Sequence, residues 1–524
     1  MHISAVLTPE KVATDVKNSD LPKEWDVIVI GSGIGAVTAA SLTSKGARVL
    51  VLESYLIPGG SSGFFERDGY TFDVGASMIF GFGDKGTTNL LTRALATVGQ
   101  KIETFADPVQ IHYHLPDGLD LKVHRDYEAF LQELIQIFPD EAQGIRGFYN
   151  EAWSVFNCLN SMELLSLEEL RYLIRVFFSN PMSCLGLVKY LPQNVGDVAR
   201  RHIKNPALLK FIDMECYCWS VVPADLTPMI NAGMVFSDRH YGGINYPKGG
   251  VGQISQKLAD GIEESGLSHV QYRARVKRVL VEGRRAVGVE LVDGTVLNAK
   301  RVVSNATRWD TFEKLVPEEY VPPSEQGWRK RYTKSPSFLS IHLGVEAQAL
   351  PPGIECHHIL LSDWTKLESC DGSGTIFVSI PTLLDPSLAP PGHHIVHVFT
   401  PSWIEDFSNL SPKEYQEKKE AMAQLVISRL EEVIPNLSKY IKVKEVGTPR
   451  THRRFLNRFD GTYGPIPSKK LLGLLSMPFN KTSLPGLYCV GDSTFPGQGL
   501  NAVAFSGFAC AHRIAADLNL PLFT

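Results

Sequence analysis

The sharpest pattern of hydrophobic and polar positions lies near the start of the chain. Residues 27–30 form an unbroken β-branched run, which is typical of a strand buried on both faces of a parallel sheet. Glycines and a helical stretch over about 36–44 follow, and residues 49–52 form a second apolar run. This order predicts a β-α-β unit that begins an α/β domain.

The residues around the first turn match the requirements of dinucleotide binding. Gly31 permits a tight turn, Gly33 lets the backbone approach a pyrophosphate, and Ala36 keeps the helix close to the strand. The first amides of the helix point at the phosphates. Glu53 ends the second strand, where a carboxylate accepts hydrogen bonds from ribose hydroxyls. The cofactor contacts predicted here are Gly31, Gly33, Ile34, Gly35, Ala36 and Glu53.

Two later glycine-rich stretches favour FAD over NAD. Residues 59–62 offer further bare amides beside the cofactor, where a nicotinamide dehydrogenase usually continues into a helix. Near the C-terminus, a short apolar run ends in Gly491 and Asp492, whose carboxylate suits the ribityl hydroxyls of FAD, and a helix starts near Gly499. The additional contacts predicted are Gly59, Gly60, Ser61, Ser62, Val276, Gly491, Asp492, Gly499 and Leu500.

These features come from parts of the chain that are distant in sequence. We therefore expect an α/β protein with a Rossmann-type FAD-binding domain assembled from discontinuous segments and an inserted α+β substrate domain. The expected division is an N-terminal extension over 1–24, an FAD-binding domain over 25–104, 249–307 and 451–517, and a substrate and membrane-associating domain over 105–248 and 308–450.

Length and composition exclude several functional classes. A chain of 524 residues is too long for one ordinary core. Its net charge is −4 and no stretch is rich in both basic and aromatic residues, which argues against nucleic-acid binding. Eight cysteines without C-x-x-C pairs are typical of a reduced intracellular compartment. We expect no spanning helix, and residues 1–24 resemble neither a signal nor a transit peptide, so a transit peptide is either unneeded or already removed.

Several motifs together resemble the carotenoid isomerases, a family within the phytoene desaturase and flavin amine-oxidase superfamily. They are the glycine loop 57–63, the segments 240–250, 305–310, 451–454 and 461–465, and the C-terminal stretch 491–507. The likeness runs from about Trp25 to Asp517. Ser61 stands where desaturases commonly carry arginine and the isomerases carry serine.

The resemblance implies redox-neutral conversion of poly-cis-lycopene to all-trans-lycopene with reduced FAD, in carotenoid biosynthesis on a thylakoid or plastid membrane. Reduced flavin can transiently lower the order of a conjugated C=C bond, so the protein mainly orients the polyene and excludes water. The alternatives are a carotene desaturase or polyene saturase on the same scaffold, and a non-enzymatic prenyl-binding protein. The intact cofactor motifs argue against the last of these.

A carotenoid resides in the bilayer, so the enzyme is expected to reach into one leaflet. Five apolar residues recur at i, i+3, i+4, i+7 and i+8 of a predicted helix, namely Leu170, Leu173, Ile174, Phe177 and Phe178. We interpret them as a monotopic membrane surface that admits the substrate. The alternative is a helix packed on the protein's own core.

Two further groups of residues carry side chains capable of catalysis or metal binding. Tyr246 and Lys248 lie between glycine pairs that allow close backbone approach, so they are candidate catalytic residues, with a loop aromatic and a rim lysine as the alternative. His112, His114 and the pair at 357–358 are interpreted as ordinary strand and loop histidines. We therefore expect no metal site.

Overall fold

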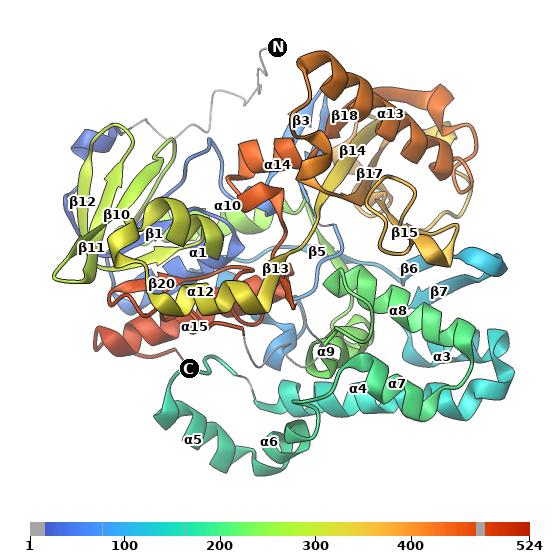
Figure 1. The fold of residues 1–524 in the computed structure, drawn as a ribbon, viewed down its shortest axis with the longest axis horizontal. Helices are drawn as coiled ribbons and strands as arrows, with labels where there is room; N and C mark the ends of the chain where they lie inside the picture. Colours follow the sequence, from blue (N-terminus) through green and yellow to red (C-terminus); the bar gives the residue numbers. More distant parts are fainter. Residues whose placement is uncertain (1–15, 76, 163, 468–476, 524) are drawn as a thin grey trace.

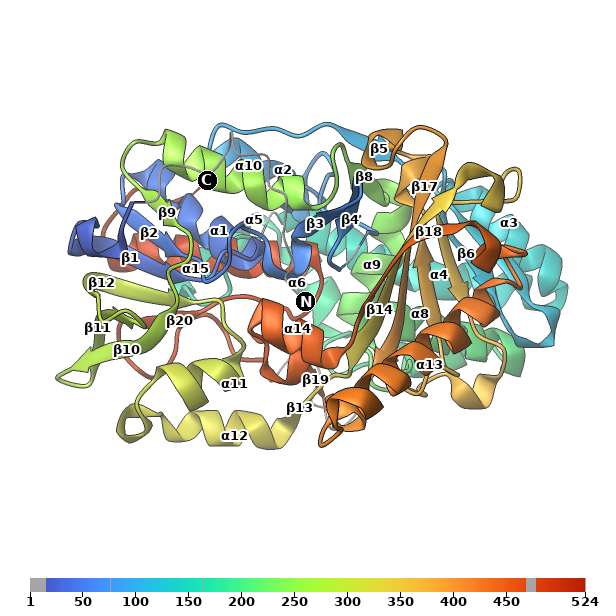
Figure 2. The ribbon, with the colours of Figure 1, turned by 90° about the horizontal axis from the view of Figure 1, so that it is seen from above.

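The computed structural model describes residues 16–75, 77–162, 164–467 and 477–523. The molecule is elongated, with one β-sheet towards each end and a group of helices beside the second sheet (Figures 1 and 2).

Strands from all three segments expected to bind FAD meet in the first sheet. The parallel strands are β1 (Glu24–Ile30), β2 (Val49–Leu52), β9 (His269–Gln271), β12 (Val296–Ser304) and β20 (Leu487–Cys489). An antiparallel hairpin of β10 (Val276–Glu282) and β11 (Arg285–Leu291) extends the sheet beyond β12. The β-branched run of β1 explains its central place, because Val27 and Val29 enter one core while Ile28 and Ile30 enter the core on the other face.

Four helices cover one face of this sheet. They are α1 (Ile34–Ala40), α2 (Leu90–Thr97), α10 (Gly252–Glu264) and α15 (Leu500–Asp517). A Cβ at Gly507 would lie 2.5 Å from the carbonyl oxygen of Gly35, so α1 and α15 pack backbone against backbone. This contact fixes the C-terminal segment against the first β-α-β unit.

The other face is covered by residues that we had expected in the substrate domain. After α11 (Arg308–Asp310), Phe312 and Val316 join the core that includes Trp25 and Ile28. Helix α12 (Pro323–Arg331) follows, and Arg308 forms a buried ion pair with Glu325 of that helix. The second part of the chain after 307 therefore packs first on the cofactor sheet and crosses to the second sheet only near residue 332.

The second sheet has the strand order β18-β14-β17-β16-β15-β6-β7. Its strands are β6 (Val109–His114), β7 (Asp120–His124), β14 (Ser337–Glu346), β15 (His357–Leu360), β16 (Ile376–Ser379), β17 (His393–Ser402) and β18 (Ile441–Gly447). On one face, Leu339, Ile341 and Leu343 of β14 pack against α13 (Pro412–Leu430). Alternation along β14 turns the residues between them to the opposite face.

The remaining elements are a group of helices and three short strand pairs. The helices are α3 (Tyr127–Ile137), α4 (Ala142–Met162), α5 (Leu170–Ser179), α6 (Pro181–Val188), α7 (Val195–His202), α8 (Pro206–Ser220), α9 (Met229–Tyr241) and α14 (Pro449–Leu456). The strand pairs are β3 (Phe64–Arg67) with β4 (Tyr70–Asp73), β5 (Thr104–Ala106) with β8 (Asn245–Pro247), and β13 (Tyr332–Lys334) with β19 (Pro465–Pro467).

A buried ion pair joins α8 to α9. Arg239 donates to Glu215, both side chains are fully buried, and the Tyr149 hydroxyl donates to the same carboxylate at 2.6 Å. Glu215→Gln is expected to lower the free energy of unfolding by about 3–5 kcal/mol, because it leaves a buried guanidinium without its counter-charge. Chemical denaturation followed by far-ultraviolet circular dichroism measures this change.

The exposed pair between Lys248 and Glu103 provides the control, since both side chains are more than half exposed. Glu103→Gln is expected to change the free energy of unfolding by less than about 1 kcal/mol. Equal losses in the two variants would contradict the distinction between the buried and the exposed pair.

Candidate active site

A cavity of about 1810 Å³ joins the carboxyl edge of the first sheet to the second sheet. Every predicted cofactor contact except Ala36 lies on its wall, namely Gly31, Gly33, Ile34, Gly35, Glu53, Gly59, Gly60, Ser61, Ser62, Val276, Gly491, Asp492, Gly499 and Leu500. Ala36 is fully buried behind the wall, in the core between α1 and the sheet. The structure therefore brings together residues from three distant segments.

The first glycine turn is held in very close contact with Asn305. Gly31 has a φ of +90°, which favours glycine, and a Cβ at Gly33 would lie 2.7 Å from the Asn305 amide nitrogen. A Cβ at Gly35 would lie 3.1 Å from the backbone nitrogen of Gly491. Without side chains at these positions, a pyrophosphate can approach the backbone of the turn closely.

Glu53 is fixed at the end of β2. Its side chain accepts hydrogen bonds from the backbone nitrogens of Ser32 (3.0 Å) and Tyr55 (2.7 Å), and the residue is buried. The carboxylate is thus presented beside the glycine turn, where ribose hydroxyls of a dinucleotide would reach it.

The second glycine loop lies directly beside the first. The backbone nitrogen of Gly59 donates to the Ser32 carbonyl at 3.0 Å, and Gly59 has a φ of +117°. A Cβ at Gly75 would lie 2.5 Å from the Ser61 carbonyl, so Gly75 is needed to keep this loop in place. Both loops therefore line the same cavity.

Sequence reasoning missed Arg458, which lines the cavity beside Asp492. Its guanidinium donates to the Asp492 carboxylate and, through Nε, to the Thr462 carbonyl at 2.5 Å. No motif links Arg458 to Asp492, so only the folded chain reveals that the acid predicted to face the ribityl chain carries a counter-charge.

Uncharged polar groups occupy the wall between the two sheets. The Tyr463 hydroxyl and His452 Nδ1 are 3.1 Å apart, and His342 Nε2 lies 2.9 Å from the Asp73 carbonyl. Burial lowers the pKa of His452 to about 3 and that of His342 to about 4, and it raises the pKa of Tyr463 to about 12. All three side chains are therefore neutral near pH 7.

The second sheet supplies an apolar wall that we did not predict. Phe338 and His342 alternate along β14 on the face opposite α13, and Phe377 and Phe399 lie on the neighbouring strands of that face. The period-two alternation of residues 337–345 is the sequence signal that would have revealed this face.

The cavity continues towards α5 and α6, which lie at the lower edge of the molecule in Figure 1. Leu187 and Leu191 line it. Most of the predicted apolar stripe is exposed: Leu170 (72%), Ile174 (47%), Phe177 (41%) and Phe178 (76%), together with Met182 (79%) and Leu185 (56%). Leu173 is half-buried. In the described part of the chain, no helix is long and apolar enough to cross a membrane.

Tyr246 and Lys248 lie away from the cavity wall. Tyr246 is buried and its hydroxyl donates to Asp73 at 2.6 Å, while the Lys248 ammonium pairs with Glu103 at 2.9 Å in solvent. Their placement argues against the expected proton transfer at the cofactor. The positive φ of Gly249 (+85°) and Gly250 (+95°) serves the turn into α10 instead of an approach to a ligand.

Comparison with known proteins identifies the family. The family model for flavin containing amine oxidoreductase matches residues 35–515. A chloroplastic prolycopene isomerase 1 from an Oncidium hybrid cultivar is 59% identical over 95% of this chain and 85% of its own. The chain belongs to the prolycopene isomerase family. The chloroplastic prolycopene isomerase of Arabidopsis thaliana is also 59% identical, over 95% of this chain and 83% of its own.

Solved structures agree on the architecture. An oxidoreductase from Methanosarcina mazei superposes with a TM-score of 0.61 at 19% identity, covering 92% of this chain and 99% of that protein. The predicted α/β fold with a discontinuous Rossmann-type domain and an inserted α+β domain is confirmed, and FAD is the cofactor of this family.

Substitution of Glu53 tests whether this wall of the cavity binds FAD. Glu53→Gln is expected to weaken FAD binding by about 10–100-fold, because a neutral amide replaces an acceptor of charge-assisted hydrogen bonds worth roughly 1.5–3 kcal/mol. Titration of FAD into flavin-free protein, followed by quenching of flavin fluorescence, measures the affinity. Glu24→Gln, at the exposed start of the same sheet, is the control. Unchanged affinity in Glu53→Gln would contradict the assignment.

Proposed function

We propose that the protein converts poly-cis-lycopene (prolycopene) to all-trans-lycopene without net redox change, using reduced FAD. The observation that carries this proposal is the 59% identity to prolycopene isomerases over 95% of the chain. The named activity of those relatives belongs to carotenoid biosynthesis, and we propose the same place for this chain.

The two ends of the cavity suit the two molecules that this reaction needs. At one end, the amides of Gly33 and Gly60 and the Glu53 carboxylate suit the phosphates and ribose of FAD. At the other end, Phe338 and Phe399 and the leucines near α6 suit a long hydrocarbon. One continuous cavity therefore allows the polyene to lie against the cofactor.

Reduced FAD, when bound, supplies electron density that transiently lowers the order of a conjugated C=C bond. The chain's own residues hold the cofactor by its polar groups, hold the polyene in the apolar part and exclude water. Tyr463 keeps its proton, since its pKa is raised to about 12, and His452 beside it stays neutral. Neither side chain places a charge beside the polyene.

Two observations disfavour the alternatives. Ser61 lies on the same cavity wall as Tyr463, at the position where desaturases commonly carry arginine, which favours isomerisation over desaturation or saturation. A prenyl-binding protein that holds no flavin has no use for the glycine cradle and the fixed Glu53 carboxylate. The cradle therefore favours an enzyme.

Product analysis tests the reaction directly. Under anaerobic conditions with chemically reduced FAD, poly-cis-lycopene is expected to yield all-trans-lycopene with an unchanged number of conjugated double bonds. Chromatography with absorbance spectra of each product distinguishes the outcomes. A lengthened chromophore would indicate a desaturase and a shortened one a saturase, and either would contradict the proposal.

We also propose that α5 and α6 rest in one leaflet of a plastid membrane, at a thylakoid surface. The relatives are named chloroplastic. Apolar side chains of the adjacent helices α5 and α6, among them Leu170, Phe178 and Met182, are exposed, and clustered exposed apolar residues often mark membrane interaction sites. Because Leu187 and Leu191 also line the cavity, a substrate dissolved in the bilayer would enter there.

Charge substitution tests this surface. Phe178→Glu combined with Met182→Glu is expected to weaken binding to liposomes by about 100-fold or more, since each side chain contributes roughly 1.5–3 kcal/mol on burial. Co-sedimentation with liposomes measures binding, and an unchanged flavin spectrum verifies the fold. Leu267→Glu, at a position 49% exposed and outside the patch, is the control. Undiminished binding of the double variant would contradict the proposal.

A further inference from the structure

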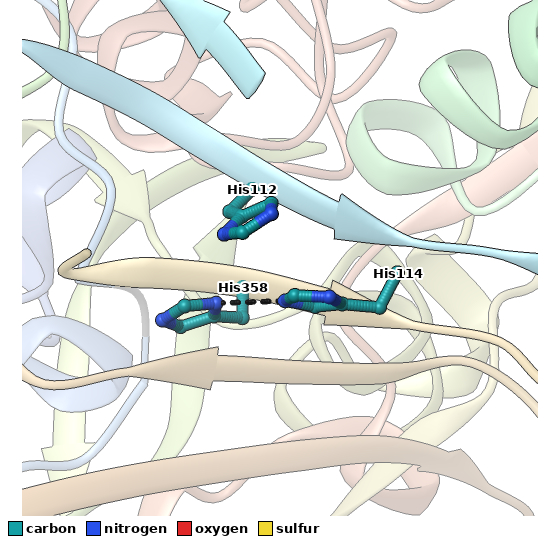
Figure 3. A group of neighbouring side chains, drawn as sticks. All are labelled: His112, His114 and His358. Atoms are coloured by element: carbon teal, nitrogen blue, oxygen red, sulfur yellow. Dashed lines mark hydrogen bonds between the residues drawn. The ribbon is translucent and has the colours of Figure 1, made fainter. Parts of the chain in front are cut away.

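Three histidines lie on one face at the edge of the second sheet. Strand β6 pairs in parallel with β15, and this pairing places His112 opposite His358. On its other side, β6 pairs in antiparallel with β7, and this pairing places His114 opposite Asp120. Side chains alternate along a strand, so His112 and His114 share a face, while Tyr113 between them is buried on the other face. Figure 3 shows the three imidazoles gathered between β6 and β15.

Two ring nitrogens of this cluster converge. His114 Nε2 and His358 Nδ1 are 3.1 Å apart (Figure 3). The other nitrogen of His114 is 2.8 Å from the Asp120 carboxylate, and that of His358 is 2.9 Å from the Glu355 carbonyl. When the outer nitrogens of His114 and His358 donate hydrogen bonds to these two acceptors, the facing nitrogens of both neutral rings carry lone pairs. Facing lone pairs repel unless a cation lies between them.

The outer hydrogen bonds of His114 and His358 fix which ring nitrogen of each residue is left to face an ion. Neutral imidazole is the form that binds metal ions. The hydrogen bonds from their outer nitrogens to a carboxylate and a carbonyl match the outer contacts that orient histidine ligands in metal sites.

His112 supplies a third ligand. One ligand nitrogen from each of His112, His114 and His358 can be chosen so that all three lie within 4.8 Å of one another. The rings of His112 and His114 are 4.1 Å apart between centroids. Asp120 and Glu355 contact His112 on its two nitrogens, which adds negative charge around the cluster.

We propose that His112, His114 and His358 bind a divalent transition-metal ion, Zn²⁺ being the best match, with Asp120 and the Glu355 carbonyl orienting two of the ligands. Tetrahedral zinc with Zn–N bonds of about 2.0–2.1 Å places ligand nitrogens roughly 3.3 Å apart, close to the observed spacing of His114 and His358. For His112 to bind, one of its two nitrogens exchanges its contact with Asp120 or Glu355 for the ion, and water can complete the coordination.

The proposed role of the ion is structural. None of the three histidines is on the wall of the cavity. They join β6 to β15, strands separated by more than two hundred residues of chain, at a parallel pairing with only three Cα partners in register. A bound ion would hold this edge of the substrate-binding sheet together, and its stabilisation would grow with the free metal concentration.

Zinc titration of the full-length, FAD-loaded and chelator-treated protein tests the proposal. Calorimetry is expected to show one Zn²⁺ per chain, and the melting temperature is expected to rise with Zn²⁺ concentration. His114→Gln combined with His358→Gln is expected to abolish both effects, and Asp120→Asn to weaken binding by about 10–100-fold. His269→Gln, which removes a first-sheet histidine paired with Glu263, is the matched control. Flavin absorbance verifies that each variant is folded.

Zinc-edge X-ray absorption identifies the ligands independently of any variant. Only nitrogen and oxygen neighbours are expected. Asp107, Cys356 and His357 form a second group of possible ligands, so a sulfur neighbour would place the ion there and overturn the proposal. The absence of a one-to-one zinc complex, or equal zinc binding by the double histidine variant, would also overturn it.

Discussion

The structure depends on a close backbone contact between parts of the chain far apart in sequence. Gly35 at the start of α1 leaves little room for a side chain against Gly491 and Asn305, and Gly507 of α15 packs on the Gly35 carbonyl. The carboxyl ends of the parallel strands β1, β12 and β20 lie side by side at this contact. The wall predicted to hold the dinucleotide combines the first glycine turn with residues that follow β12 and β20, so no single segment forms it alone.

The second sheet supplies an apolar wall opposite the residues predicted to bind the cofactor. Its apolar face meets the cofactor end of the cavity through neutral histidines, and the cavity then continues to exposed apolar helices. These features suit a reaction in which the cofactor supplies the chemistry. The protein then mainly orients the hydrocarbon substrate against the cofactor and shields both from water.

Local patterns in the sequence were sufficient to predict residues that the structure brings to one cavity wall. The glycine turn, Glu53 and the loop at 59–62 are contiguous motifs whose geometry follows from backbone chemistry, and the structure places them on one wall. The sequence does not reveal which strands and loops that are distant along the chain lie side by side. The Arg458–Asp492 pair and the three-histidine cluster arise from pairings between distant strands and loops. Tyr246 was misplaced because its flanking glycines shape a turn, while its hydroxyl is satisfied by Asp73.

The central claim is that the protein isomerises the polyene without net redox change, and that the reduced flavin it would hold ends each cycle in its starting redox state. Anaerobic turnover with a large excess of prolycopene, with flavin absorbance recorded throughout, tests it most directly. Many molecules of all-trans-lycopene are expected to form per chain while the flavin stays reduced. Oxidation of the flavin in proportion to product would contradict it.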